Sequence, residues 1–333
     1  MDVLSDVLQA VRLSGAVFYE VEAQAPWVAS ARPALEQAPD VMPGFQHVME
    51  YHIVSRGRCW VALENGRAGA VALDAGSVVV FPHGDAHVMS SDPACQAGPG
   101  HGVVRQSLRG EPLPFYLGEG QADADEESGR ARLVCGFLGC DLSPFNPVVQ
   151  ALPRMLHVSA LPTGENDVLP RLVQAAVAES RVRRPGHAGV LSRLSELLFI
   201  EVVRRHFEAL PPGQKGWFGA LADPQLGRVL HLMHGEPATA WTLAELARRA
   251  AMSRTVLVER FGGQLGLSPM AYLANWRMQL ASGMLAGSQA SLARIAEAVG
   301  YQSEAAFSRA FKRCQGTSPA QWRRQQAGGL NPQ

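Results

Sequence analysis

An internal repeat in the last third of the chain constrains its fold more than any other feature. The stretch TLAELARRAAM, which begins at Thr242, aligns with SLARIAEAVGY, which begins at Ser291, at an offset of 49 residues. Beyond the following turn the offset is 50, so that Phe261 falls on Phe311. Each copy has apolar residues at helical spacing, a short turn and a second apolar helical stretch. The pattern therefore predicts two helix-turn-helix units in tandem.

The second helix of each copy has an outward side whose residue types suit contact with DNA. In the second copy, Ala305, Ser308, Arg309 and Lys312 share one face, which has small residues, a hydroxyl and two cations but no carboxylate. Arginine can contact guanine with two hydrogen bonds, and lysine can hold phosphates. We expect DNA contacts from Arg254, Thr255, Val258 and Glu259 in the first copy and from Ser303, Ala305, Ser308, Arg309, Lys312 and Arg313 in the second. For Glu259, pairing with a neighbouring arginine is the alternative.

The formal net charge of zero is divided unevenly along the chain. Residues 224–333 contain 12 basic residues (lysine and arginine) and 5 acidic residues (aspartate and glutamate). The rest of the chain contains 18 basic and 25 acidic residues. A basic third joined to an acidic remainder is typical of a polyanion-binding module on a separate body, although chance variation gives the same pattern. We see no signal peptide and no apolar run of about 20 residues. Five cysteines without metal-finger spacing favour a reducing compartment, so we expect a cytoplasmic protein with no membrane partner.

The stretch from Asp223 to Arg324 resembles the DNA-binding domain of the AraC/XylS family of bacterial transcription regulators. The resemblance is carried by WTLAELARRAAMSRTVLVERF, SPMAYLANWRM and IAEAVGYQSEAAFSRAFKRCQGTSPAQWR. It implies two recognition helices, Ser253–Gly263 and Ser303–Cys314, in adjacent major grooves of double-stranded DNA. A helix of roughly 15 residues that starts at Pro269 would join the two copies.

The N-terminal part has a different pattern, of short apolar runs separated by turn residues. From about Met42 to Val88 these runs alternate with turns such as Asn65-Gly66, which predicts a small antiparallel β-sandwich or barrel. The stretch GSVVVFPHGDAH, residues 76–87, resembles the second motif of the cupin barrel. The likeness extends more loosely over residues 1–160 and implies the cupin-like sensor of one AraC-type subgroup.

The predicted fold class is α+β with several domains. A cupin-like, effector-sensing β-barrel with helices is expected at residues 1–160, a helical dimerisation and linker region at 161–217, and an all-α double helix-turn-helix domain at 218–326. In the middle region a wide apolar stripe runs along one predicted helix, through Leu191, Leu194, Leu198 and Val202. This stripe predicts a homodimer, and packing against the barrel of the same chain is the alternative.

The barrel sequence lacks part of the ligand set of metal-dependent cupins. Cupin enzymes use a His-x-His pair and a glutamate from a first motif and a histidine from the second. Here His87 matches the second motif and Glu50 the carboxylate, but the His-x-His pair is missing, so we expect no catalytic residue, no metal and no other cofactor. Instead, His52 and His87 are expected to line a pocket for a mostly apolar effector. The alternatives are a structural role or a degenerate metal site drawn from His52, His83, His87, Cys135 and Cys140.

These features predict a sequence-specific, DNA-binding transcription regulator that responds to a small-molecule effector. RNA polymerase is a further candidate partner. The alternative from another class is a cupin-type metal-dependent enzyme with an accessory DNA-binding domain. The intact duplicated helix-turn-helix and the incomplete ligand set favour the regulator.

Overall fold

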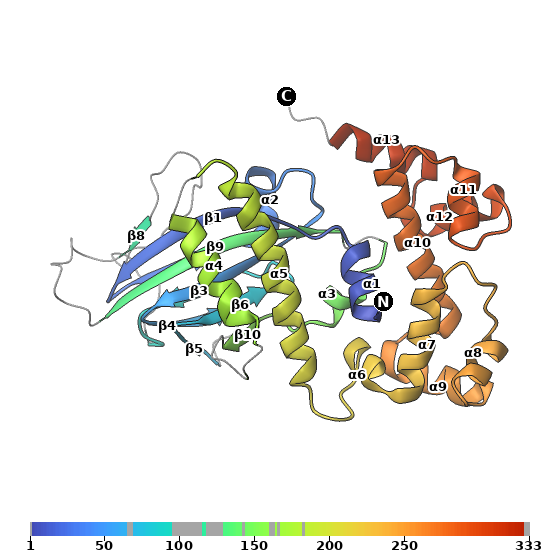
Figure 1. The fold of residues 1–333 in the computed structure, drawn as a ribbon, viewed down its shortest axis with the longest axis horizontal. Coiled ribbons are helices and arrows are strands. Elements are labelled where there is room, and N and C mark those ends of the chain that lie inside the picture. Colours follow the sequence, from blue (N-terminus) through green and yellow to red (C-terminus); the bar gives the residue numbers. More distant parts are fainter. Residues whose placement is uncertain are drawn as a thin grey trace. The chain divides into compact units, whose positions relative to one another are not determined.

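The computed structural model describes residues 2–64, 69–94, 115–117, 129–141, 144–159, 164, 167–181 and 184–329 (Figure 1). Contacts between residues divide the chain into two compact units. The first unit combines Met1–Arg12, Asp141–Ala151 and Ala209–Gln333, and the second combines Leu13–Cys140 and Leu152–Glu208. None of the described helices has the length and apolar character needed to cross a membrane.

The second unit contains two β-sheets, as the alternating N-terminal pattern predicted. The six-stranded sheet has the order β10-β6-β3-β9-β1-β8, and the four-stranded sheet has the order β2-β7-β4-β5. All neighbouring strands are antiparallel except β1 and β8. The strand bounds are β1 Ser14–Gln24, β2 Val28–Ala31, β3 His47–Arg56, β4 Arg58–Leu63, β5 Val71–Asp74, β6 Ser77–Phe81, β7 His87–Ser90, β8 Phe115–Leu117, β9 Arg130–Cys140 and β10 Leu156–Ser159.

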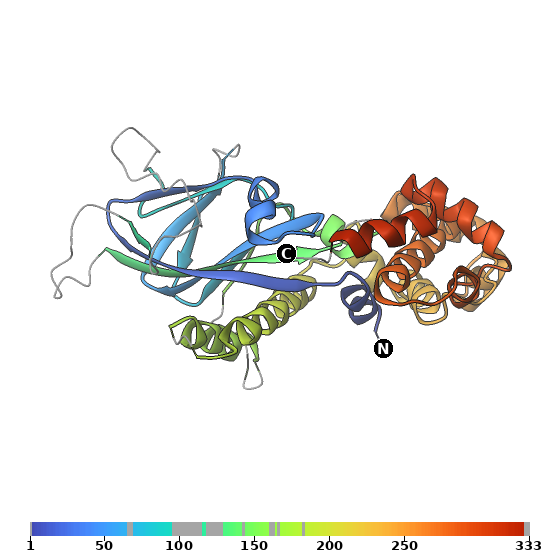
Figure 2. The ribbon, with the colours of Figure 1, turned by 90° about the horizontal axis from the view of Figure 1, so that it is seen from above.

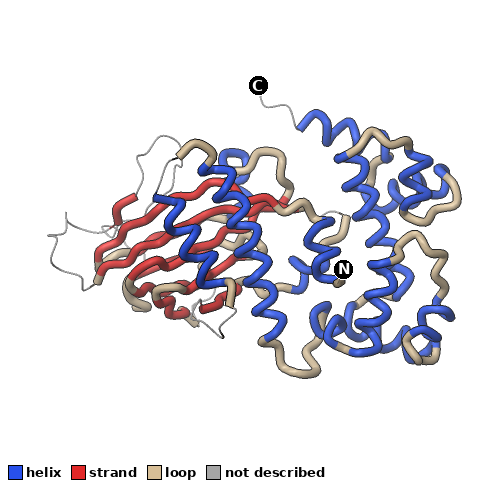
Figure 3. Tube along the Cα trace, viewed as in Figure 1, coloured by secondary structure: helices blue, strands red, loops and turns tan. Residues whose placement is uncertain are grey.

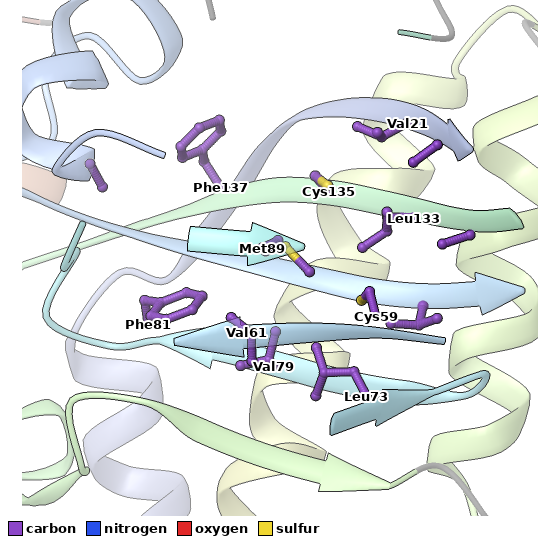
Figure 4. Packing of buried hydrophobic residues seen from close by; sticks show 14 of the residues in the cluster. Val21, Cys59, Val61, Leu73, Val79, Phe81, Met89, Leu133, Cys135 and Phe137 are labelled. Atoms are coloured by element: carbon purple, nitrogen blue, oxygen red, sulfur yellow. The ribbon is translucent and has the colours of Figure 1, made fainter. Parts of the chain in front are cut away.

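An apolar core lies between the two sheets (Figure 4). It includes Val79 and Phe81 from β6, Leu133 and Phe137 from β9 and Cys59 from β4, all of them buried. Alternate residues of a strand point to opposite faces, so every second side chain of these strands reaches the core. The predicted turn at Asn65-Gly66 lies outside the described residues.

Gly57 shows why one of the predicted turns needs glycine. It joins β3 to β4 with a φ of +75°, a conformation that most residues avoid. A Cβ atom at this position would lie 1.9 Å from the carbonyl oxygen of Arg130. The turn that folds β4 back across the core therefore depends on the missing side chain.

Three further helices complete the second unit: α2 Ala34–Val41, α4 Leu169–Arg181 and α5 His187–Glu208. Helix α5 packs on β1 and α4 packs on α5, so both helices lie on the same side of the six-stranded sheet (Figure 2). The hydroxyl of Tyr51 on β3 forms a hydrogen bond of 2.9 Å with the hydroxyl of Ser195 on α5. Three residues of the predicted apolar stripe, Leu191, Leu198 and Val202, are buried within the chain. For these three residues the structure supports the alternative given above, which was packing against the barrel of the same chain.

The regular elements in the described part of the first unit are helices joined by loops (Figure 3). Its helices are α1 Val3–Ala10, α3 Pro147–Ala151, α6 Trp217–Ala222, α7 Pro224–Gly235, α8 Leu243–Arg249, α9 Arg254–Leu265, α10 Pro269–Gly287, α11 Leu292–Ala298, α12 Glu304–Gln315 and α13 Pro319–Gly329. The connecting helix α10 is 19 residues long, which is longer than the roughly 15 residues expected. It buries residues on several sides, including Tyr272, Trp276 and Leu285, because it contacts helices of both repeats.

Two short segments from the N-terminal part of the sequence pack within this first unit. Helix α1 contacts α7 and α10, and α3 contacts α6. The buried side chain of Gln279 on α10 joins both segments, because its amide oxygen accepts from the Phe145 N–H at 3.1 Å and its amide nitrogen donates to the Ala10 carbonyl at 3.0 Å. The domain boundaries at residues 160 and 217 stay a prediction.

Candidate DNA interface and buried histidine pair

The two helix-turn-helix copies begin each helix in the same way. The hydroxyls of Thr242 and Ser291 cap α8 and α11, and those of Ser253 and Ser303 cap α9 and α12. Each hydroxyl accepts from a backbone N–H three residues later at 3.2 or 3.3 Å. These caps satisfy N–H groups that have no partner within the helix, and they fix where the helix starts.

The turns of the two copies use the same backbone conformation with different residues. Gly300 has a φ of +80°, and Ala251 at the matching place has a φ of +52°. A Cβ atom on Gly300 would lie 2.7 Å from the Ala238 carbonyl oxygen, so glycine is needed there for space as well as for conformation. Alanine seldom adopts positive φ, so the sequence signals this turn more weakly at Ala251 than at Gly300.

Aromatic side chains hold the second helix of the second copy in a fixed rotation about its axis. Phe307 and Phe311 are fully buried, and Phe311 meets Trp322 of α13 edge to face at 6.0 Å between ring centroids. Leu257 and Phe261 are buried at the matching positions of α9. With these residues buried, the opposite side of each helix faces outward. Cys314, three residues after Phe311 in α12, is exposed.

The outward side of α12 carries exposed cations. Arg309, Lys312 and Arg313 are exposed with Ala305, and Ser308 is half-buried beside them. Among the residues that the structure describes, none of these three cations forms an ion pair with a carboxylate. Glu304, an exposed carboxylate in the first turn of α12, was not among the residues considered on this side of the helix.

The matching side of α9 is exposed and carries one cation, Arg254, and one carboxylate, Glu259. Arg254, Thr255, Val258 and Glu259 are all solvent-accessible. The neighbouring Val256 is 40% exposed, and its apolar side chain was not among the expected contacts. Within the described residues Glu259 forms no ion pair, so nothing in this part of the structure supports its pairing with an arginine. All ten expected DNA-contact residues thus lie on or beside α9 and α12, and their contacts with DNA stay a prediction.

In the barrel, His52 and His87 meet side chain to side chain. His52 lies on β3 and His87 starts β7, and their Nε2 atoms are 2.7 Å apart. The Nδ1 atom of His52 is 2.8 Å from the Cys135 sulfur, which β9 places opposite His52 in the strand register. The ring of His87 stacks on Phe81 at 3.6 Å between centroids, and its Nδ1 lies 3.0 Å from the Asp85 carbonyl oxygen.

Burial sets the protonation of this pair. Burial lowers the pKa of His52 well below its ordinary value, and the neighbouring His87 lowers it further. Burial also lowers the pKa of His87, to about 4, against the opposing effect of its contact with Asp85. Both imidazoles are therefore neutral at pH 7. A neutral imidazole keeps a lone pair on one ring nitrogen, so it can accept a hydrogen bond or bind a metal.

Of the five candidate metal ligands from the sequence, the structure brings three together. His83 is exposed, and its Nε2 donates to the Leu152 carbonyl at 2.9 Å. Cys140 is buried at the end of β9, where it is paired in register with His47. Glu50 was absent from that candidate set, yet its carboxylate oxygen is 3.7 Å from the His52 Nε2 atom. The sequence had already matched Glu50 to the carboxylate of the first cupin motif, and its position two residues before His52, on the same face of a strand, was a second signal.

The comparisons with known proteins match an N-terminal and a C-terminal stretch of the chain. A cupin family model matches residues 2–208, and a helix-turn-helix domain model matches residues 246–325. A putative AraC-like transcription regulator of Streptomyces lividans is 34% identical over 227 residues, covering 66% of this chain and 74% of that protein. The HTH-type transcriptional regulator AlkR of Acinetobacter baylyi is 28% identical over 98% of this chain and 100% of its own length.

A solved structure is similar to part of the C-terminal region. The DNA-binding domain of AdpA, determined in complex with a target DNA, is 28% identical, with a TM-score of 0.31, and covers 33% of this chain and 97% of that one. Since the cupin model matches more than half of the chain and the relatives are transcription regulators, the chain belongs to the AraC/XylS family of transcription regulators, with an N-terminal cupin domain and a C-terminal double helix-turn-helix domain.

Proposed function

We propose that this DNA-binding regulator reads base sequence mainly through α12, with α9 in the adjacent major groove. The observation that carries the proposal is the row of exposed cations on α12, which forms no ion pairs within the described residues. A cation without a carboxylate partner is available to phosphates and to guanine edges. Footprinting of the full chain on genomic fragments tests the proposal. Two protected major-groove segments on one face of the duplex are expected, and a single protected segment would contradict it.

We further propose that the cupin domain acts as a sensor of a small-molecule effector and not as an enzyme. The named relatives are transcription regulators, which supports regulation over catalysis. The residues expected near the effector are His52 and His87. The protein would work in the cytoplasm on double-stranded DNA, with RNA polymerase as a further partner.

The two lysines of the chain allow a matched test of phosphate contact. Lys312→Ala should weaken binding to operator and random DNA alike and reduce the magnitude of the salt slope of log K by about 1, because one phosphate contact is lost. Lys215→Ala is the control, since Lys215 is exposed in the segment before α6. Fluorescence anisotropy across a salt series measures both. Equal slopes for the two variants would exclude a phosphate contact by Lys312.

We also expect the chain to form a homodimer through α5. Val190 and Leu197 are 47% and 49% exposed, and their spacing of two helical turns places them on one side of α5. Leu197→Glu should therefore shift the full chain from dimer to monomer in sedimentation at micromolar concentration, because a carboxylate is costly to bury. Leu35→Glu, at a 66% exposed position on α2, should leave the mass unchanged. A wild-type chain that sediments as a monomer with operator DNA present would refute the dimer.

A further inference from the structure

Three side chains inside the barrel place metal-binding atoms around one point. A carboxylate oxygen of Glu50 and ring nitrogens of His52 and His87 lie within 4.8 Å of one another, and all three residues are buried. The closest pairs are the two Nε2 atoms at 2.7 Å and the His52 Nε2 and Glu50 Oε1 atoms at 3.7 Å. A carboxylate and two imidazoles are groups that bind metal ions in proteins. Their grouping around one point therefore suits a compact cation at the centre of the three groups.

The other ring nitrogens have contacts of the kind that orient metal ligands. A metal-bound histidine usually uses its second ring nitrogen to donate to a carbonyl, carboxylate or similar acceptor. The Asp85 carbonyl can only accept, so Nδ1 of His87 carries the proton and Nε2 carries the lone pair. On His52, Nδ1 is directed at the Cys135 sulfur at 2.8 Å, and this contact orients Nε2 toward Glu50 and His87.

The distances are close to those around a small transition-metal ion. Tetrahedral zinc has bonds of about 2.0–2.2 Å to nitrogen and oxygen, which puts neighbouring ligand atoms about 3.3–3.6 Å apart. The observed 2.7 Å and 3.7 Å lie on either side of that separation, and all the ligand atoms lie within 4.8 Å of one another, so they would shift to reach tetrahedral geometry. Imidazoles next to a thiol favour zinc over magnesium or calcium, which prefer oxygen ligands.

We propose that Glu50, His52 and His87 form a zinc site in the barrel, with Cys135 as the residue that positions His52. This ligand set keeps two members of the cupin set, the carboxylate of Glu50 and the second-motif histidine His87, but it lacks the His-x-His pair. One imidazole comes instead from the position two residues after the glutamate on β3. The proposal concerns only the barrel and is independent of how α9 and α12 contact DNA.

Calorimetric titration of the full chain with zinc sulfate tests the site. One zinc per chain is expected, with affinity reduced at least 100-fold in Glu50→Gln, His52→Ala and His87→Ala. Cys135→Ser should weaken binding by about 10- to 100-fold, as loss of a contact that orients a ligand does. His83→Ala and Cys140→Ser are the controls and should bind like the wild type. Undiminished binding in the Glu50, His52 and His87 variants, or an equal loss in the two controls, would overturn the proposal.

A second measurement needs no variant and so does not depend on whether the variants fold. X-ray absorption at the zinc edge of the loaded wild-type chain should show two imidazole ligands and at least one oxygen ligand. Fewer than two imidazoles would overturn the proposed site, and so would wild-type protein that takes up no zinc. Magnesium and calcium, each titrated alone, should give no binding at this site, and tight binding of either would contradict the assignment to zinc.

Discussion

Gln279→Leu should release α1 and α3 from α10 while leaving the two helix-turn-helix copies folded. Leucine has nearly the same size but removes both hydrogen bonds that the amide makes, to the Phe145 N–H and the Ala10 carbonyl. A buried backbone group without a partner costs about 1–3 kcal/mol, and two such groups are affected. Amide hydrogen exchange in α1 should therefore become at least tenfold faster, measured by mass spectrometry of the intact chain.

The control for this variant is Gln289→Leu, because Gln289 is exposed just after α10. It should leave exchange in α1 unchanged. Exchange in α12 should stay slow in both variants, since α12 is held by Phe307 and Phe311 and has no contact with Gln279 among its described hydrogen bonds. If α1 of Gln279→Leu exchanges at the wild-type rate, the amide does not hold the two segments.

Arg309→Ala should weaken binding to the operator by about 1–3 kcal/mol, which is about 5- to 150-fold, with little effect on random DNA. The reason is that a guanidinium can bind guanine with two hydrogen bonds and so discriminate against other bases. Competition binding with operators substituted at each position should show relaxed preference at one base pair. Arg309 is exposed at the middle of the outward face of α12, where such a contact is possible.

Arg309→Lys separates charge from base reading. Lysine keeps the positive charge but lacks the planar pair of donors, so non-specific affinity should remain while much of the operator preference is lost. Full operator affinity in Arg309→Lys would mean that Arg309 acts only as a charge near phosphates. If Arg309→Ala lost the same binding affinity for operator DNA as for random DNA, the conclusion would be the same.

The tandem helix-turn-helix could be predicted from the sequence because its signals are local. The capping hydroxyls of Thr242 and Ser291 and the helical spacing of Phe307 and Phe311 each depend on residues within a few turns of one another. Where the signal was weak, at Ala251, the packing of the surrounding helices imposed a positive φ on an alanine. Tertiary contacts can outweigh a local preference of this size.

The centre of the barrel and the role of Gln279 could not be predicted in the same way. Strand alternation puts His52 on the face opposite Tyr51, but it cannot show which strand lies next to β3. The contact with Cys135 depends on the register of β3 against β9, and the contact with His87 depends on the second sheet. Gln279 sits in a helical pattern where a polar residue usually faces water.

The packing of α1 within the C-terminal helices also imposes an order on how the chain folds during synthesis. Gln279 and Ala10, which are hydrogen-bonded, are 269 residues apart in sequence. A ribosome makes N-terminal residues first, so α1 emerges long before α7 and α10, two of the helices that it contacts. The two sheets can form in the meantime, since β1 and β9 pair within residues already made. Docking of α1 on α7 and α10 is then a late step across a long loop.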